Sequence, residues 1–265
     1  MLNSLLMTEW NAAGYVKRSG LQEAMAAEVL ALLQLRGNER VLDIGCGDGR
    51  VTAEIANRVP RGSVVGVDAS HEMIAFAQTH AAQSNLSFEV ANAARLVFQN
   101  EFDLVVSFNA LHWLPDPGAP LRCMRTAMKP SGRAQLRLVP DGERKSLETV
   151  LEETRKSARW ASYFQNFTNP YLHVTPEQYA AAAEHNRFRV ESLHSSAKSW
   201  DFHTREAFFA VGSVTFVEWT RRLPKSEKPA FINDVLDRYQ PVAADTPAEA
   251  HTFKFYQLDV TLTPV

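Results

Sequence analysis

Short apolar runs alternate with amphipathic stretches over residues 41–140 of the chain. Helical spacing of the apolar positions predicts helices over residues 50–58, 71–82 and 117–128. β-Branched runs predict five strands, at residues 41–45, 63–68, 86–90, 102–109 and 133–139. The fourth run is apolar almost throughout, which is typical of a strand buried on both faces of a parallel sheet. Strands joined by helical crossovers in this way predict an open, mostly parallel α/β sheet with right-handed connections.

The pattern changes after residue 140. Apolar positions three and four apart predict an amphipathic helix over residues 143–160, and Thr175 caps a second helix that runs through Ala183. Residues 204–240 predict two helices separated at Pro224, and residues 188–200 and 252–263 predict two further strands. We therefore expect a single domain over residues 1–265, composed of a first segment (1–30), a core (38–140), a helical cap (141–187 and 203–240) and the last strands of the sheet (188–202 and 252–265).

Composition and charge exclude several classes of protein. The chain has 265 residues, 45% of them hydrophobic, and 28 Lys and Arg side chains against 30 Asp and Glu. A chain of this size buries enough surface to fold without disulfide or metal staples, and its balanced charge argues against duplex nucleic acid or an anionic membrane as a partner. Cys46 and Cys123 fit no disulfide or zinc spacing, so we expect no metal site. The N-terminal residues lack the pattern of a signal peptide and no apolar run is long enough to span a bilayer, so we expect a cytoplasmic protein.

A glycine-rich turn follows the first predicted strand and opens the first predicted helix, with the sequence Asp43-Ile44-Gly45-Cys46-Gly47-Asp48-Gly49. Such a turn lets a ligand approach the backbone, and the helix N-terminus offers N–H groups to a negative group. The glycine order differs from the dinucleotide fingerprint GxGxxG, because Arg50 stands where its third glycine belongs. Asp68 ends the second predicted strand, where a carboxylate accepts hydrogen bonds from ribose hydroxyls. A merely tight turn and a helix cap at Asp68 are the alternatives, but together the two features predict a nucleoside-containing ligand.

The glycine turn, residues 65–70 with Met73, and residues 102–113 resemble the class I S-adenosylmethionine-dependent methyltransferases. The likeness covers about residues 10–140, and the His112-Trp113 pair is most similar to the branch of trans-aconitate and juvenile hormone acid methyltransferases. This resemblance implies a Rossmann-like, seven-stranded, mostly parallel sheet with helices on both faces, and a helical cap from insertions after strand five and between the last strands. It also implies S-adenosyl-L-methionine as the cofactor and S-adenosyl-L-homocysteine as the product.

By position, the resemblance assigns the cofactor to residues that follow the first four strands, with the first segment (1–30) as a lid over it. The contacts that it implies are Tyr15, Asp43, Gly45, Cys46, Gly47, Asp68, Ala69, Met73, Asn92, Ala93, Phe108 and Asn109. Asn92 departs from the aspartate of many relatives, so its contact with adenine would lack a charge.

His112 is the catalytic candidate, because it stands at the end of the fourth strand, where the transferred methyl group should lie. It would donate a hydrogen bond to a carboxylate acceptor, or act as general base for an acceptor that must lose a proton. A packed histidine bonded to a loop carbonyl is the structural alternative.

The predicted acceptor pocket is aromatic and comprises Trp10, Trp113, Tyr163, Phe164, Trp200, His203, Phe208 and Phe216. Aromatic residues at helical spacing also form the cores of helical units, so that alternative stays open. A tricarboxylate acceptor would need Arg205, Arg221 and Arg222 to converge on the pocket, whereas their alternative is a solvated face.

These observations predict an enzyme that transfers a methyl group to a small, mainly apolar molecule, with carboxylate O-methylation by in-line displacement favoured. Methylation of carbon, nitrogen or a hydroxyl oxygen, with His112 as base, is the alternative within the class. A non-catalytic cofactor-binding module is the alternative outside it. No Asn/Asp-Pro-Pro-Tyr/Phe segment follows the fourth predicted strand, which argues against nucleic-acid methylation. We expect a small-molecule acceptor as the partner, and a monomer or homodimer.

Overall fold

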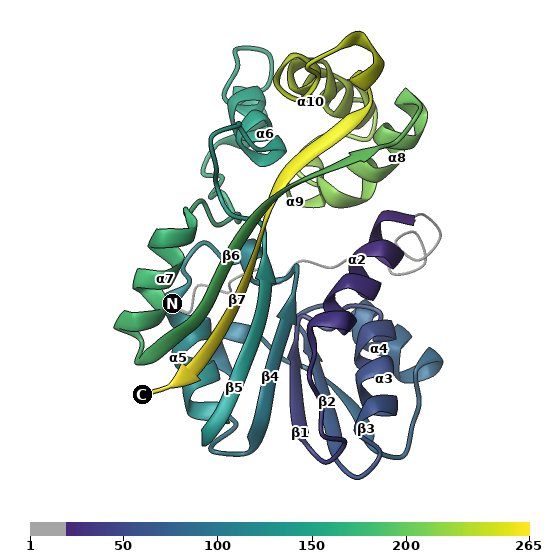
Figure 1. Cartoon of the computed structure of the whole chain (residues 1–265). Coiled ribbons are helices and arrows are strands. Elements are labelled where there is room, and N and C mark those ends of the chain that lie inside the picture. Colours follow the sequence, from purple (N-terminus) through teal and green to yellow (C-terminus); the bar gives the residue numbers. More distant parts are fainter. Residues whose placement is uncertain (1–19) are drawn as a thin grey trace.

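Seven strands form one sheet in the computed structural model, which describes residues 20–265. They are β1 (Arg40–Ile44), β2 (Ser63–Asp68), β3 (Leu86–Val90), β4 (Phe102–Phe108), β5 (Met128–Leu138), β6 (Phe188–Asp201) and β7 (Thr252–Pro264). Their order is β3-β2-β1-β4-β5-β7-β6, with β1 to β5 parallel and β7 antiparallel to both of its neighbours. The open, mostly parallel sheet expected from the sequence is confirmed (Figure 1). Trp10, Tyr15 and most of the expected lid lie outside the described residues.

Helices cover both faces of this sheet, because alternate residues of the inner strands point to opposite sides. The helices on the two faces are α2 (Gly20–Leu32), α3 (Arg50–Arg58) and α4 (His71–His80) on one, and α5 (Gly118–Ala127) and α7 (Pro176–His185) on the other (Figure 1). Val41 packs in a cluster with Ile55 of α3, whereas its neighbour Leu42 packs in the cluster that contains Leu121 of α5. Full burial of each such side chain stabilises the fold by roughly 1.5–3 kcal/mol.

α7 packs on the sheet, although the sequence pattern alone places residues 141–187 in the cap. Its Tyr179 and Ala183 are buried in the same apolar cluster as the residues of α5. The predicted capping threonine is confirmed, since Thr175 Oγ1 accepts a hydrogen bond from Gln178 N at 3.3 Å and Gln178 Oε1 accepts one from Thr175 N at 2.9 Å. The local signal therefore identifies the helix, while long-range packing makes it part of the core.

β5 begins earlier than the apolar run at residues 133–139 predicts. Phe102 of β4 pairs with Met128, but Leu104, only two residues on, pairs with Arg133. Residues 129–132, which have the composition of a turn, therefore form a bulge within β5. Pro130 lies in this bulge. Proline has no backbone N–H to donate, and the bulge interrupts the regular hydrogen bonding between the strands, so it is tolerated there.

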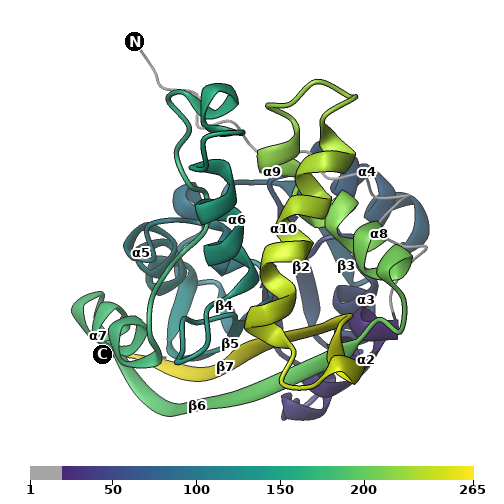
Figure 2. The ribbon, with the colours of Figure 1, turned by 90° about the horizontal axis from the view of Figure 1, so that it is seen from above.

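The cap lies over the carboxyl edge of the sheet (Figures 1 and 2) and is carried by a two-stranded ribbon. β7 pairs with β5 only over residues 258–262 but with β6 over residues 252–264, so the first half of β7 leaves the sheet together with β6. The cap elements are α6 (Leu147–Arg155), η3 (Ala161–Phe164), α8 (Arg205–Thr215), α9 (Val217–Thr220), α10 (Lys228–Ala243) and η4 (Pro247–Glu249).

The helices of the cap differ from the predicted ones in their bounds and number. α6 is shorter than the predicted helix at residues 143–160, and it starts later because the Ser146 hydroxyl caps it by accepting a hydrogen bond from Thr149 N at 3.1 Å. Three helices, rather than two, occupy residues 204–243.

Within residues 20–265, no helix is both long enough and apolar enough to cross a membrane.

Candidate active site

The glycine turn carries the chain from β1 into α3 at the carboxyl edge of the sheet. Gly45, Gly47 and Gly49 have φ values of 76°, 54° and 80°, a region that glycine occupies without strain. A Cβ atom on Gly45 would overlap Ala110 Cβ, whereas one on Gly47 would meet no atom of the described residues within 4 Å. Gly45 is therefore required for packing against the segment after β4, while the open side of Gly47 lets a ligand approach the backbone.

Asp68 lies beside this turn at the end of β2. Its Oδ2 accepts a hydrogen bond from Gly47 N at 3.0 Å, and its Oδ1 accepts one from Ser70 N at 2.9 Å. Ser70, not Asp68, caps α4, since the Ser70 hydroxyl accepts from Met73 N at 3.3 Å. Asp68 thus holds the glycine turn in place. A carboxylate has about four acceptor positions, so it can take ribose hydroxyls as well.

Asp43 and Cys46 are buried within the turn. Asp43 is 3% exposed, and burial raises the pKa of its carboxyl to about 7, although Thr52 Oγ1 donates a hydrogen bond to Oδ2 at 2.7 Å and favours the charged form. The negative charge of Asp68 raises this pKa further. Burial also raises the pKa of the Cys46 thiol well above its ordinary value. The thiol therefore stays protonated and is not a nucleophile.

The residues that follow β2 and β3 border the same edge, because Asp68 and Val90 pair across these strands. Asn92 caps η1 (Ala93–Arg95), with its Oδ1 accepting a hydrogen bond from Ala94 N at 2.9 Å. Two further candidates, Ala69 and Ala93, are half-buried, and Met73 is buried. The structure therefore brings together the residues that the resemblance assigns to ribose and adenine.

Asn109 follows β4 in the left-handed conformation, with φ of 58°. Its N–H donates to Arg137 O at 2.8 Å, but its side-chain oxygen Oδ1 is buried and has no hydrogen-bond partner among residues 20–265. A buried oxygen without a partner costs about 1–3 kcal/mol. The next residue, Ala110, packs against Gly45, so Asn109 stands beside the glycine turn, and its unpaired oxygen suits a ligand that donates an N–H. Phe108, before Asn109, is half-buried beside α3.

The donors and acceptors at this edge fit the cofactor that the resemblance implies. Asp68 provides a carboxylate for ribose hydroxyls, Asn109 provides an unpaired acceptor for an ammonium group, and Gly47 leaves the backbone open to a close approach. A ligand with an amino-acid end and a nucleoside end satisfies all three.

His112 lies in η2 (Leu111–Trp113), shortly after β4, and is 5% exposed. Val139 N donates a hydrogen bond to its Nδ1 at 3.3 Å. Nδ1 is therefore the nitrogen without hydrogen, and Nε2 carries it. Burial lowers the pKa of this imidazole to about 3, so the ring is neutral near neutral pH. No residue in the described part of the chain accepts a hydrogen bond from Nε2.

Aromatic rings surround His112 on the cap side. Its ring centroid lies 5.7 Å from that of Trp113 and 5.3 Å from that of Tyr171. Trp113 stands edge-on to Tyr171 at 5.4 Å and lies 6.4 Å from Trp219 of α9. Tyr171 belongs to the aromatic cluster at residues 163–171 of the sequence, but the predicted pocket did not include it, because it lies between η3 and α7 in a segment without periodicity or motif.

The other aromatic residues predicted for the pocket do not gather at His112. Phe164, Phe208 and Phe216 are at most 4% exposed and belong to the apolar core of the cap. The remaining candidates are the surface residues Tyr163 and His203 and the half-buried Trp200 of β6. A cap made of separate helices needs a core of its own, and these phenylalanines supply it. Among the described candidates, Trp113 alone makes a ring contact with His112.

The arginines considered for a tricarboxylate are engaged elsewhere. Arg205 pairs with Asp237 at 2.6 Å, and Arg221 pairs with Glu218 at 2.5 Å. Arg222 is exposed and lies over the ring of Phe167 at 5.8 Å. They therefore do not converge on the His112 side of the sheet edge.

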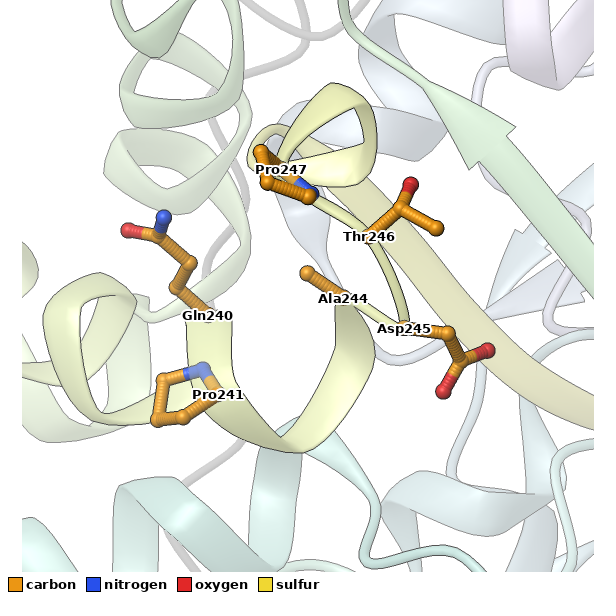
Figure 3. Close-up of a pocket in the computed structure, with 6 residues that line it drawn as sticks. All are labelled: Gln240, Pro241, Ala244, Asp245, Thr246 and Pro247. Atoms are coloured by element: carbon orange, nitrogen blue, oxygen red, sulfur yellow. The ribbon is translucent and has the colours of Figure 1, made fainter.

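A hollow of about 330 Å³ lies at the carboxyl end of α10 (Figure 3) and contains none of the candidate residues. It is lined by Gln240, Pro241, Ala244, Asp245, Thr246 and Pro247. Over residues 20–265, no group of three His, Cys, Asp or Glu side chains could hold a metal ion. The candidate site is therefore the edge formed by the glycine turn, Asp68, Asn109 and His112.

Comparison with known proteins agrees with this geometry. Residues 41–132 match the family model described as a methyltransferase domain. The putative methyltransferase 235L of Invertebrate iridescent virus 6 is 27% identical over 235 residues, which cover 87% of this chain and 85% of that protein. The trans-aconitate 2-methyltransferase of Variovorax paradoxus (strain S110) is 32% identical over 161 residues, 60% of this chain and 61% of that protein, so the chain matches less than two thirds of its length.

A solved structure supports the fold over nearly the whole chain. The structure of a putative methyltransferase from Bacillus halodurans C-125 has a TM-score of 0.65 at 18% identity, covering 91% of this chain and 99% of that one. This likeness concerns the fold, whereas the family match covers the strands and turns that carry the site. Residues 41–132 are therefore a methyltransferase domain, and these likenesses support an S-adenosylmethionine-dependent methyltransferase.

Proposed function

We propose that this enzyme methylates the carboxylate of a small, mainly apolar molecule. The observation that carries this proposal is the state of His112, which is neutral, has hydrogen on Nε2, and has its other nitrogen occupied by Val139 N–H. A carboxylate is an anion at neutral pH and needs no base. An acceptor hydroxyl or ammonium group must lose a proton, and His112 offers no vacant nitrogen lone pair to receive it.

Asp68, Asn109 and Gly47 would hold the cofactor. Asp68 would accept from the ribose hydroxyls, Asn109 Oδ1 from the ammonium group, and Gly47 would allow close contact with the backbone. When bound, S-adenosylmethionine supplies an electrophilic methyl group on a positively charged sulfur. The protein's part is then to place the acceptor in line, and such positioning accounts for roughly 7–11 kcal/mol of the barrier in well-oriented reactions.

His112 would orient the acceptor by donating its Nε2 hydrogen to a carboxylate oxygen. A neutral donor suits this task, because a cation held on the carboxylate would lower the nucleophilicity of its oxygens. The rings of Trp113 and Tyr171 lie beside His112 and would contact the apolar remainder of the acceptor. The Variovorax relative is named for trans-aconitate, a tricarboxylate, and this supports a carboxylate as the methylated group.

Acceptor profiling with mass-labelled S-adenosylmethionine tests the proposal. Carboxylic acids, phenols and amines of similar size are offered, and the labelled product is identified by mass spectrometry. We expect methyl esters, which are released by mild alkali. Single-turnover rates at saturating cofactor should be nearly constant between about pH 5 and 8, because a carboxylate acceptor is largely ionised over this range, whereas a phenol or an amine would react faster as the pH rises.

Two substitutions separate a donor from a base. His112→Gln keeps an N–H near the position of Nε2 and should retain activity within about tenfold, whereas His112→Leu should lose about 10- to 100-fold, the effect of one hydrogen bond to a charged group. Labelled phenols or amines in place of esters, or a rate that rises tenfold per pH unit, would contradict the proposal.

The cytoplasmic location, the monomeric or homodimeric state and the division into cofactor core and cap are inferences from the sequence, and they belong to the same proposal. Gel filtration coupled to light scattering measures the oligomeric state directly.

A further inference from the structure

Tyr171 carries a buried hydroxyl that has no hydrogen-bond partner among residues 20–265. The residue is 4% exposed. Buried polar groups without partners are rare, and each requires an explanation such as a ligand, a catalytic role or a bound water. The ring of Tyr171 lies 5.3 Å from that of His112 and 5.4 Å from that of Trp113. The ring that carries this unpaired hydroxyl therefore lies on the acceptor side of the site, beside His112 and Trp113.

The backbone around Tyr171 is held on both sides. Tyr171 N donates to Asn169 Oδ1 at 3.0 Å, and Leu172 N donates to His112 O at 2.8 Å. Leu172 is 3% exposed and packs in the main apolar core. The missing hydrogen bond thus belongs to a residue whose backbone is well anchored.

Tyr239 shows how a buried tyrosine is satisfied when its role is structural. Its hydroxyl donates to Lys254 O at 2.7 Å and accepts from Lys254 N at 3.0 Å. It lies in the core of the cap. The chain therefore contains a matched control for Tyr171, with the same side chain and the opposite hydrogen-bonding state.

The ionisable groups near Tyr171 are the carboxyls of Glu148 and Asp141 and the imidazole of His173, whose ring lies 5.4 Å from that of Tyr171. Burial, and then the charges of Glu148 and Asp141, raise the pKa of its hydroxyl well above the ordinary value, so it is a neutral donor. Asp141 also pairs with His173 at 3.3 Å. The two neutral donors, Tyr171 and His112, suit one carboxylate. The arginines considered for further carboxylates, Arg205 and Arg221, are paired with Asp237 and Glu218.

We propose that Tyr171 binds the acceptor by donating a hydrogen bond from its hydroxyl to the carboxylate, and that the site selects acceptors with a single carboxylate and an apolar remainder. This inference rests on the proposed carboxylate methylation. In that reaction an acceptor oxygen forms a bond to the methyl carbon, and the electron pair of the broken carbon–sulfur bond stays on sulfur. The product is a neutral ester and no proton is transferred, so neutral donors are sufficient.

The test compares Tyr171→Phe with Tyr239→Phe. The substrates are straight-chain acids from butanoic to dodecanoic acid and the α,ω-diacids of the same lengths, with labelled methyl transfer as the assay. For Tyr171→Phe we expect kcat/KM for the best monoacid to fall about 10- to 100-fold, an unchanged affinity for S-adenosylhomocysteine, and a Tm equal to or above that of the wild type. For Tyr239→Phe we expect a lower Tm and kcat/KM within about threefold of the wild type.

The two proposals fail in different ways. If the wild type forms no ester with any of these acids, the proposed function is contradicted. If the wild type forms esters but kcat/KM of Tyr171→Phe stays within twofold of the wild type, Tyr171 does not bind the acceptor. Its hydroxyl then bonds a buried water or has no hydrogen-bond partner. If Tyr171→Phe lowers Tm as much as Tyr239→Phe, its role is structural. A diacid used as well as the monoacid of equal length contradicts the selection for a single charge.

Discussion

Replacing Asp43 with asparagine should stabilise the protein above pH 7 and leave its stability unchanged near pH 4. Asp43 is 3% exposed at the end of β1, and burial raises the pKa of its carboxyl from 3.8 to about 7. Asparagine has nearly the same shape. Its amide oxygen can accept the hydrogen bond from Thr52 Oγ1, which lies 2.7 Å from Asp43 Oδ2.

The size of the effect follows from the two pKa values. Below pH 3.8 the carboxyl is protonated in both the folded and the unfolded chain, so there is no penalty. Between pH 3.8 and about 7 the unfolded chain ionises while the folded chain keeps its proton, and the folded state loses stability as the pH rises. At 1.36 kcal/mol for each pKa unit, the penalty above pH 7 is at most about 4 kcal/mol, and Asp43→Asn removes it.

Urea unfolding of the two proteins between about pH 4 and 8, without cofactor, measures this difference. Other buried groups, such as His112 with its pKa of about 3 and Glu148 with its pKa of about 7, are present in both proteins and cancel. Asp103→Asn is the control, and its effect on stability should have the opposite sign to that of Asp43→Asn. The Lys129 ammonium lies 2.7 Å from Asp103, whose pKa is lowered, so that substitution should destabilise at neutral pH and have less effect as the pH falls. A difference between the wild type and Asp43→Asn that stays constant from pH 4 to 8 would refute the reasoning.

Two further predictions concern the cofactor edge. Asp68→Ala removes the carboxylate that holds Gly47 N, and it should weaken S-adenosylhomocysteine binding about 10- to 100-fold in calorimetry; unchanged affinity would exclude Asp68 from the site. Gly45→Ala combines a positive φ with overlap at Ala110 and should destabilise by about 2–5 kcal/mol in urea unfolding. The new Cβ of Gly47→Ala meets open space, so this variant should lose only about 1–2 kcal/mol of unfolding free energy while its cofactor binding weakens. Equal losses of stability in Gly45→Ala and Gly47→Ala would contradict this contrast.

The cofactor half of the site was predictable from the sequence because it depends on local features. Strands of apolar β-branched residues end at the glycine turn and at Asp68, and parallel strands place such ends at one edge of the sheet. Asn109 was assigned to this edge by the resemblance to the methyltransferases. Its unpaired oxygen could not be foreseen, because the absence of a partner depends on every segment that packs around it.

The acceptor half was predicted less well, for a physical reason. Helical spacing of Phe208 and Phe216 is the same whether a helix faces a pocket or the core of the cap, and only the packing of α6, α8 and α10 decides between them. His203 and Tyr163 were also predicted to line the pocket, but both lie at the surface. Tyr171 had no pattern of its own and acquires its place through the contact of Leu172 N with His112 O.

By itself, the sequence determined the class of fold, the glycine turn and the carboxylate at the end of β2 that is proposed to bind ribose, since periodicity and turn chemistry act between residues close in the chain. The tertiary structure decided the protonation of His112, the inward face of the cap and the position of Tyr171. Each of these depends on burial and on partners far apart in sequence, such as Val139 N for His112. Desolvation is a property of the whole packed molecule, so it cannot be read from any single segment.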